Sequence, residues 1–410
     1  MRATSLLRTL LALPRTVVTG FEFDAESLII DVKPTWRHAR CGDCQRKSPC
    51  EGRRLRYWRH LDLGGIKCRL RYAIRRVNCS RCGVKTEAVP WAESGSWFTR
   101  PFEMHTTYLA KVTDKTTVTK LMRISWVTVG KIIQRVVARQ RGDGDHLDEL
   151  RIIGVDELSY RRHHKYVTVV VDHARGVVVW AAEGKSAATL NQFFTALGAE
   201  RSAKLEAVTI DMSAAYIKAV SEATPEATII FDRFHIQRKA HDALDAVRRD
   251  EVREAAPADK KALKKTRWPL QKNPWNLSEL EEKKLSELQR TNKRIYRAYL
   301  LKETLAAVLD SRFLSIARMK LDEWLAWASR SRLTPFVKLA RTIRKYREGI
   351  LEYVRGRLNN GRVEGLNGKI RTITRRSYGF HSSDALISMI FLCCGGVHAY
   401  PAHVYPFWTH

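Results

Sequence analysis

The spacing of hydrophobic residues in the first third of the chain changes from a strand pattern to a helix pattern. Two short runs rich in β-branched residues, Thr16–Phe23 and Ser27–Val32, predict a pair of strands. From Thr99 to Arg141 the pattern is helical, and Ser125 is placed to cap the longer helix. The buried face of that helix should consist of Val129, Ile132, Ile133, Val136 and Val137. A short helix, a tight turn and a basic helix are typical of a helix-turn-helix, although any small helical bundle shares this pattern.

Beyond residue 150 the pattern changes to strands and then alternates between strands and helices. We expect strands at Ile152–Leu158, Tyr166–Asp172, Gly176–Ala182, Ala207–Asp211 and Thr228–Asp232, with helices at Ala187–Leu197 and from Ser213. Three strands in a meander, followed by helix, strand, helix and strand, predict an α/β fold with a mixed five-stranded sheet flanked by helices. From about Ala240 to Gly349 only helical spacing is present. The four tryptophans of this helical region could stack on distorted DNA: Trp268, Trp275, Trp324 and Trp327.

The charge of the chain narrows the classes of partner. Seventy-three Lys and Arg residues against 43 Asp and Glu residues leave a formal net charge of +30, which favours a polyanionic partner. Basic residues interleaved with Trp and Tyr fit nucleic acid better than a membrane surface. No apolar run reaches the roughly 18 residues of a membrane span, so we expect no membrane association.

Eight cysteines in a large basic chain fit a cytosolic protein with a metal site better than a disulfide framework. The pairs Cys41-x-x-Cys44 and Cys79-x-x-Cys82 can each place two thiolates on one tetrahedral ion, which predicts structural zinc. Cys50 and Cys68 are possible substitutes or bystanders, whereas Cys393 and Cys394 fit core packing in an apolar helix. Basic side chains crowd this region and could form a phosphate-binding face or a merely solvated one. Our candidate DNA contacts in the first 150 residues are Arg69, Arg71, Lys131 and Arg135.

Two aspartates stand in or directly after predicted strands. Asp156 follows the apolar run Ile152–Val155, and Asp211 closes the fourth strand. Because the carboxyl ends of neighbouring strands in an α/β sheet converge, these two side chains could meet although 55 positions separate them (211 − 156). Each one taken alone is more simply a strand-end or helix-capping aspartate. Asp172, for example, is expected only to turn a hairpin.

A late glutamate, Glu364, lies near the start of a predicted helix that begins at Arg362. Val363, Leu366, Ile370 and Ile373 should form the buried stripe of this helix, with Glu364, Asn367 and Arg371 on the other face. Gly365 and Gly368 would let DNA or metal approach the helix closely. Three carboxylates gathered from such positions can hold two Mg²⁺ ions and act on phosphodiesters. An ordinary amphipathic helix with a solvated glutamate is the alternative. Candidate phosphate contacts around the glutamate are Arg362, Lys369, Arg371, Arg375 and Arg376.

Asp232 and His235 end the last predicted strand. A carboxylate three residues ahead of a histidine can contact substrate or orient a metal-bound group. The same two residues are equally consistent with a structural hydrogen-bonded pair.

These residues together resemble a known family. The blocks GVDELSYRRHHKYVTVVVDH, VTIDMSAAYIKAV, FDRFHIQRKAHDALDAVRRDE and NNGRVEGLNGKIRTITRRSYGF are similar to signature blocks of the ISL3 family of insertion-sequence transposases, in the DDE superfamily. The cysteine-rich region and the 101–141 segment resemble the family's zinc-binding and helix-turn-helix domains. The resemblance implies an RNase H-like core interrupted by an all-α insertion. It also implies that Asp156, Asp211 and Glu364 form the catalytic triad, with His235 in an accessory motif that begins at Asp232.

The resulting expectation is a DDE transposase that binds the terminal inverted repeats of its insertion sequence and performs Mg²⁺- or Mn²⁺-dependent DNA cleavage and strand transfer. Its partners would be double-stranded DNA, both element ends and target, and further copies of itself in a homodimer or higher synaptic assembly. Its location would be the cytoplasm, at the bacterial nucleoid. Two alternatives stay open: a metal-dependent RNase H-like nuclease that never joins DNA, and a DNA-binding regulator with an inactive core. The expected parts are a hairpin and zinc ribbon (1–95), a helix-turn-helix (96–148), the first part of the core (149–245), an all-α insertion (246–350) and the last part of the core (351–410).

Overall fold

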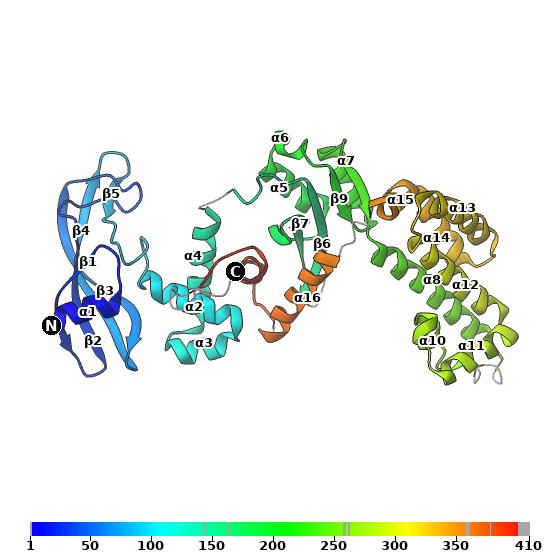
Figure 1. Ribbon diagram of the computed structural model, residues 1–410, viewed down its shortest axis with the longest axis horizontal. Helices are drawn as coiled ribbons and strands as arrows, with labels where there is room; N and C mark the ends of the chain where they lie inside the picture. Colours follow the sequence, from blue (N-terminus) through cyan, green and yellow to red (C-terminus); the bar gives the residue numbers. More distant parts are fainter. Residues whose placement is uncertain are drawn as a thin grey trace. The chain divides into compact units, whose positions relative to one another are not determined.

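The computed structural model describes residues 2–142, 145–161, 165–256, 260, 263–356, 361–377 and 379–400 (Figure 1). The chain divides into two compact units, Met1–Gly144 with Val397–His410, and Asp145–Gly396. The first unit thus includes residues from Val397 onward, which the sequence-based division assigns to the last part of the core. No described helix is both long enough and apolar enough to cross a bilayer.

The first unit begins with a short helix and a five-stranded sheet. Helix α1 (Ala3–Leu11) precedes strands β1 (Thr16–Phe23), β2 (Ser27–Pro34), β3 (Cys50–Leu63), β4 (Ile66–Cys79) and β5 (Gly83–Thr86). The order is β1-β2-β4-β3 with β5 on β4, and only the β2–β4 pair is parallel. Strands β3 and β4 form a long hairpin whose turn uses Gly64 and Gly65 at positive φ. Trp58, Leu70 and Trp91 are fully buried in the core beneath it.

Three helices complete the first unit and confirm the predicted helical pattern. They are α2 (Arg100–Val112), α3 (Lys115–Met122) and α4 (Trp126–Gly142). The Ser125 hydroxyl accepts a hydrogen bond from the backbone N–H of Thr128 at 3.2 Å, as expected of a helix cap. The five apolar residues predicted for the buried face of α4 are all buried.

The second unit contains the predicted mixed sheet. Strands β6 (Ile152–Arg161), β7 (Lys165–Asp172) and β8 (Val177–Glu183) form an antiparallel meander, and β9 (Ala207–Ile210) and β10 (Thr228–Phe231) run parallel to β6. The strand order is β10-β9-β6-β7-β8, so β6 lies in the middle. The Asp172 carboxylate accepts the backbone N–H of Ala174 at 2.7 Å, which confirms its role in the β7–β8 hairpin.

Helices cover both faces of this sheet. Helices α5 (Ala187–Leu197), α6 (Ala199–Ser202) and α7 (Ala214–Ala223) lie between the strands in sequence, and α16 (Gly361–Arg376) and α17 (Ser383–Cys394) follow much later. The Tyr216 hydroxyl of α7 hydrogen-bonds Thr168 on one face at 2.9 Å. Gly154, whose strand position points to the opposite face, lies against Val363 of α16.

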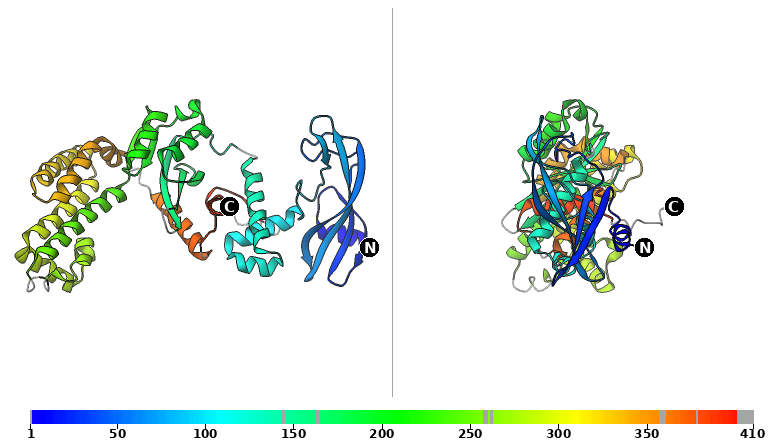
Figure 2. Two further views of the ribbon diagram at one scale, coloured as in Figure 1. Left: turned by 180° about the vertical axis from the view of Figure 1, so that it is seen from behind. Right: turned by 90° about the vertical axis from the view of Figure 1, so that its left-hand side faces the viewer.

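A helical segment separates β10 from α16 (Figure 2). Its elements are α8 (Arg233–Glu254), α10 (Arg267–Gln271), the 3₁₀ turn η1 (Pro274–Asn276), α11 (Glu279–Thr291), α12 (Lys293–Leu309), α13 (Leu314–Arg330), α14 (Thr334–Lys345) and α15 (Arg347–Gly356). The prediction that this region holds no strand is confirmed for its described residues. The boundary predicted at residue 245 falls inside α8. The segment returns to the sheet through α15, because Gly349 lies against the ring of Phe231 and the carbonyl of Ile229 in β10.

Candidate active site and cysteine cluster

Four cysteines of the first unit meet as the CxxC spacing predicts. Cys41 and Cys44 come from the loop after β2, and Cys79 and Cys82 from the β4–β5 turn. Their sulfurs lie within 4.8 Å of one another, with 3.5 Å between Cys44 Sγ and Cys79 Sγ. Tetrahedral thiolates around zinc are about 3.8 Å apart, given Zn–S bonds of about 2.3 Å. The backbone N–H groups of Arg81 and Cys82 lower the pKa of Cys79 to about 6, whereas the hydrogen bond with the Cys44 side chain raises the pKa of Cys82 to about 12. The cluster therefore fits zinc.

The other four cysteines lie outside this cluster. Cys50 is exposed, and Cys68 is buried in the core of the first unit, where burial raises the pKa of its thiol to about 12. Cys393 and Cys394 are buried in α17, in agreement with the core packing expected of them. None of these thiols is placed to join the four sulfurs.

The carboxylate of Asp156 is held from two sides. The backbone N–H of Glu157 donates to Asp156 Oδ1 at 2.7 Å, and the side-chain amide of Asn367 donates to Asp156 Oδ2. Asn367 belongs to α16, which packs against β6 where Gly154 leaves space. A Cβ at Gly154 would lie only 2.6 Å from Val363 Cγ2. A glycine two residues before Asp156 thus lets the late helix reach the central strand.

Asp211 lies beside Asp156 because β9 runs parallel to β6. Gly154 and Thr209 are paired in register, and Asp211 directly follows β9. The Asp211 carboxylate accepts the backbone N–H of Ser213 at 3.0 Å at the start of α7. Burial raises the pKa of Asp156, and the negative charge of Asp211 raises it further. The two aspartates therefore share one electrostatic environment, as the convergence of strand ends predicts.

Glu364, Asp232 and His235 lie in the same environment. Asp232 caps α8 by accepting the N–H of Phe234 at 3.1 Å, and His235 Nε2 lies 3.9 Å from Asp232 Oδ2. Glu364 is exposed overall, but partial burial of its carboxyl raises its pKa. The charges of Asp232 and Asp156 raise the pKa of Glu364 further, whereas His235 and Arg371 lower it. Within the described residues these acids do not gather as tightly as the cysteines, which are the one set of three or more Cys, His, Asp or Glu ligands within 4.8 Å.

Two residues that sequence reasoning did not assign to the site also lie there. Asn367, expected on the polar face of α16, is buried with 2 % exposure, and Leu366 is only half-buried. Glu157 is half-buried, and burial together with Asp211 raises its pKa. In the sequence, only the position of Asn367 three residues after Glu364, on the same face of the helix, pointed to the first residue. Strand alternation places Glu157 on the face opposite Asp156, so the sequence did not point to the second.

The candidate DNA contacts differ in their exposure and in whether they form ion pairs within the protein. Arg69 and Lys131 are exposed, as are Lys369, Arg371 and Arg375 on α16, whereas Arg376 is half-buried. The side chain of Arg362 lies outside the described part of the structure. Arg71 forms an ion pair with Asp31 at 2.6 Å and another with Glu22, and Arg135 pairs with buried Glu103 at 2.8 Å. These two arginines therefore have carboxylate partners within the protein.

Comparison with known proteins agrees with this geometry. The family model of ISL3-type DDE transposases, described as transposase, matches residues 153–390, more than half of the chain. The chain belongs to the ISL3 family of DDE transposases. It is 39% identical over 431 aligned residues to the transposase for insertion sequence element IS1557 of Mycobacterium tuberculosis, covering 97% of this chain and 96% of the relative. It is 28% identical to the transposase for insertion sequence element IS1001 of Bordetella parapertussis, covering 88% and 90%.

The matched region of this transposase contains the whole carboxylate site. Asp156, Asp211 and Glu364 all lie within residues 153–390, whereas the cysteine cluster precedes them. The resemblance stated from the sequence motifs is thus confirmed at the level of the family. The transposase accordingly acts on DNA, in line with its charge of +30.

Proposed function

We propose that this transposase cuts the ends of its insertion sequence and joins them to target DNA, with Asp156, Asp211 and Glu364 as catalytic residues. The observation that carries the proposal is the packing of α16 on β6. The Asn367 amide reaches the carboxylate of Asp156, and the charge of Asp156 contributes to the raised pKa of Glu364, three residues earlier on the same helix. Acids that meet from distant parts of a chain repel one another, so such a cluster favours a site that binds a cation.

We further infer that the second unit has an RNase H-like fold. The support is its topology: an antiparallel β6-β7-β8 meander is extended at β6 by two parallel strands, with helices on both faces. On this interpretation the helical segment between β10 and α16 is an insertion into that fold.

The three carboxylates offer oxygen ligands that suit Mg²⁺ or Mn²⁺. Carboxylate oxygens are the ligands that hard divalent cations prefer, and burial together with mutual repulsion raises the pKa of both Asp156 and Glu364. Asp156, Asp211 and Glu364 would hold the ions. When bound, divalent ions activate a water or a 3′-hydroxyl and stabilise the departing oxygen. The chain itself orients Asp156 through Asn367, and exposed Lys369 and Arg371 are available to contact phosphates.

The first unit would bind the terminal inverted repeats. Its cysteine cluster would hold one structural Zn²⁺ through Cys41, Cys44, Cys79 and Cys82. Helices α3 and α4 have helix-turn-helix spacing, and exposed Lys131 on α4 and Arg69 on β4 are available for DNA. We propose no direct DNA contact for Arg71 and Arg135, since internal carboxylates hold them.

Pairing of two element ends requires more than one copy of the chain, so we propose a homodimer or higher assembly on DNA. Similarity to transposases of bacterial insertion sequences supports action in the bacterial cytoplasm, on the chromosome.

A strand-transfer assay separates the proposed function from its alternatives. Duplexes carrying the element ends, supplied intact or with a pre-cut 3′ end, are incubated with Mg²⁺ and a target plasmid. The transposase should cut the first and join the second. Cutting without joining would indicate a nuclease, and specific binding without cutting would indicate a regulator with an inactive core.

The triad is tested by Asp156→Asn, Asp211→Asn and Glu364→Gln. Each variant should lose more than about a hundredfold in cleavage rate, beyond the roughly 10- to 100-fold cost of removing a group that only orients a ligand. Each should still bind the element ends, because the first unit supplies that contact. Glu352→Gln, on α15, is the matched control. Undiminished cleavage by Asp156→Asn would remove the catalytic assignment.

A further inference from the structure

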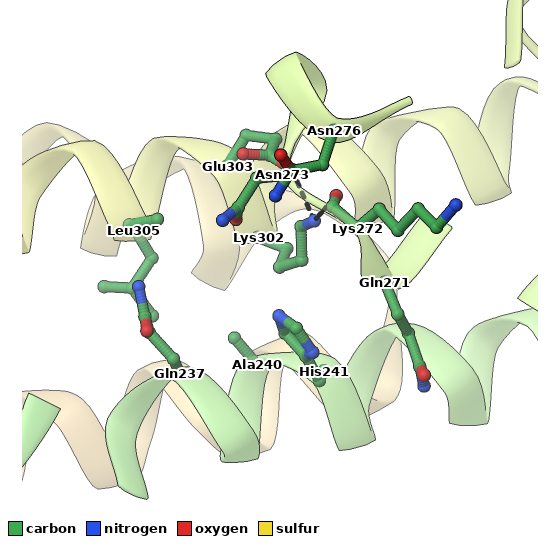
Figure 3. Close-up of a pocket in the computed structure, with 11 residues that line it drawn as sticks. Gln237, Ala240, His241, Gln271, Lys272, Asn273, Asn276, Lys302, Glu303 and Leu305 are labelled. Atoms are coloured by element: carbon green, nitrogen blue, oxygen red, sulfur yellow. Dashed lines mark hydrogen bonds and ion pairs between the residues drawn. The ribbon is translucent and has the colours of Figure 1, made fainter. Parts of the chain in front are cut away.

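The helical segment contains a cavity of about 300 Å³ that the transposase family does not explain. Helices α8 and α12 form two of its walls, and the α10–η1 stretch closes a third (Figure 3). Its polar lining consists mainly of side-chain amides and an imidazole, those of Gln237, Gln271, Asn273, Asn276 and His241. This volume is at the small end of ligand-binding pockets, so the cavity fits one small planar group.

The charges that line the cavity cancel. The Nζ atom of buried Lys302 donates to the carbonyls of Leu270 and Lys272 at 3.1 and 3.2 Å and pairs with the carboxylate of Glu303. The amine of Lys272 pairs with Glu281 at 2.7 Å. Lys302 therefore fastens the α10–η1 stretch to α12 and offers no net positive charge to an anion. The cavity suits an uncharged polar ligand better than a phosphate.

Several polar groups of the cavity have no protein partner. Within the described residues, no hydrogen bond engages the side-chain amides of Gln271, Asn273 or Asn276, or the ring of His241. An amide presents a donor and an acceptor side by side, which is the pattern that reads the edge of a nucleobase. Leu305 and Ala240 add an apolar surface for the face of a ring.

Two tryptophans of the α10–η1 stretch are unusually exposed. Trp275 lies between the lining residues Asn273 and Asn276 and is 76% exposed, and Trp268 is 65% exposed. Trp324 of the same segment is instead buried in the core, where the indole N–H donates to the carbonyl of Leu301 at 2.8 Å. The tryptophans of this segment are therefore not all exposed. Exposed aromatic rings are the platforms on which unpaired bases stack.

One helix joins the cavity to the candidate active site. His235 and the lining residues Gln237, Ala240 and His241 all belong to α8. The rise from His235 to His241 is about 9 Å at about 1.5 Å per residue. At 3.6 residues per turn, the three lining residues of α8 lie on the side of the helix opposite His235.

We propose that this cavity receives an unpaired nucleobase, extruded from the DNA close to the cut phosphate. Asn273 and Asn276 read its edge, and Trp275 stacks on it or on the base beside it. Extrusion gives the enzyme access to a distorted backbone at the cut and costs a few kcal/mol of unstacking, which the cavity offsets. The proposal rests on the proposed function, because it requires DNA cut at the carboxylate site.

The test is a double-mutant cycle in which each protein variant is combined with DNA that lacks one base, and binding is compared. Dissociation constants are measured in an Asp156→Asn background for end duplexes with a single abasic sugar at each position near the cut. Asn273→Ala/Asn276→Ala should weaken binding to the intact duplex about tenfold. That loss should vanish on the duplex whose missing base is the one that the cavity receives. Trp275→Ala should show the same dependence.

Matched controls come from the same segment. Gln289→Ala changes an exposed amide on α11, and Phe313→Ala changes an aromatic ring that is 64% exposed; both should bind every duplex like the parent. No loss with Asn273→Ala/Asn276→Ala, or the same loss on every abasic duplex, would overturn the cavity proposal while cutting by the wild-type chain upholds the transposase. Failure of the wild-type chain to cut the element ends would overturn both.

Discussion

The side-chain amide of Asn367 donates a hydrogen bond to the carboxylate of Asp156 across 211 positions of sequence. This contact fixes α16 on β6 and sets the direction of the Asp156 oxygens. Asn367 does not touch the DNA on this interpretation; it acts through Asp156, as groups that orient metal ligands do.

Asn367→Leu removes this contact while keeping a buried side chain of similar size. We expect the cleavage rate to fall about 10- to 100-fold, with end binding unchanged. The Mg²⁺ concentration for half-maximal rate should rise as well, which a purely structural defect would not cause. Thr372→Ala is the control, because its hydroxyl bonds only the carbonyl of Gly368 in its own helix. An unaltered Mg²⁺ requirement in Asn367→Leu would contradict the positioning role.

Gly154→Ala should separate α16 from β6. The new methyl group would lie 2.6 Å from Val363 Cγ2 and 2.9 Å from the ring of His173, so one element must move. Overpacking of this kind costs about 1–3 kcal/mol of unfolding free energy. Urea unfolding and cleavage rate should both decline. Full activity with unchanged stability would show that the fit is looser than these distances.

Gly365→Ala provides the opposite case on α16. Among the described residues, a Cβ at Gly365 meets nothing within 4 Å, so the change should stabilise the helix by about 0.5–1 kcal/mol. We nevertheless expect slower DNA cleavage, because this open position adjoins Glu364, where DNA would approach. Kinetics with element-end duplexes check the expectation. Faster or equal cleavage would mean that DNA does not come close to Gly365.

Removal of the cysteine cluster should release metal from the first unit. Cys41→Ser/Cys79→Ser is expected to lose about one equivalent of zinc in elemental analysis and to become more sensitive to proteolysis in β3–β5. Cys50→Ser, which changes an exposed cysteine outside the cluster, should retain the zinc. Equal zinc in the two variants would contradict the assignment.

The buried His60 should make the first unit less stable in acid. Burial, aided by Arg59, lowers the pKa of His60 to about 4, although Asp62 opposes the effect; the ring is held by Thr99 Oγ1 at 2.8 Å. The unfolded chain takes up a proton on His60 below about pH 6.5, whereas the folded chain does so only near pH 4. The free energy of unfolding therefore has its full value above pH 6.5 and declines as the pH falls toward 4. Between pH 7 and pH 5 we expect a loss of about 2 kcal/mol.

Hydrogen exchange of the β3 and β4 amides at the two pH values measures this loss. His60→Gln, which does not titrate in this range, is the control and should lose about 2 kcal/mol less over the same interval. Parallel pH profiles for the two proteins would show that His60 is not the responsible group.

Local periodicity was sufficient to predict β1, β2 and the helices of the first unit and the five strands of the second unit. The apolar face of α4 and the β6-β7-β8 meander follow from residue spacing, since each depends on neighbours in sequence. The meeting of Asp156 with Asp211 followed from the general convergence of strand ends.

The features that sequence could not predict depend on distant partners. Asn367 is buried because a carboxylate from β6 satisfies its amide, and Leu366 beside it looks the better core residue from periodicity alone. From the sequence alone, Arg71 and Arg135 are plausible DNA contacts. The structure shows that they form ion pairs with Asp31 and Glu103. The burial of Lys302 likewise requires two carbonyls from the α10–η1 stretch.

The helical segment leaves the sheet directly after β10 through α8 and comes back to the same strand through α15, where Gly349 fits against Phe231 and Ile229. The two ends at which the segment joins the sheet are therefore neighbours, however long the segment is. A module attached in this way can be enlarged, shortened or grafted from another transposase without stretching the strands that carry the acids. Evolution can therefore remodel how such an enzyme grips its substrate while leaving the chemistry of the cut untouched.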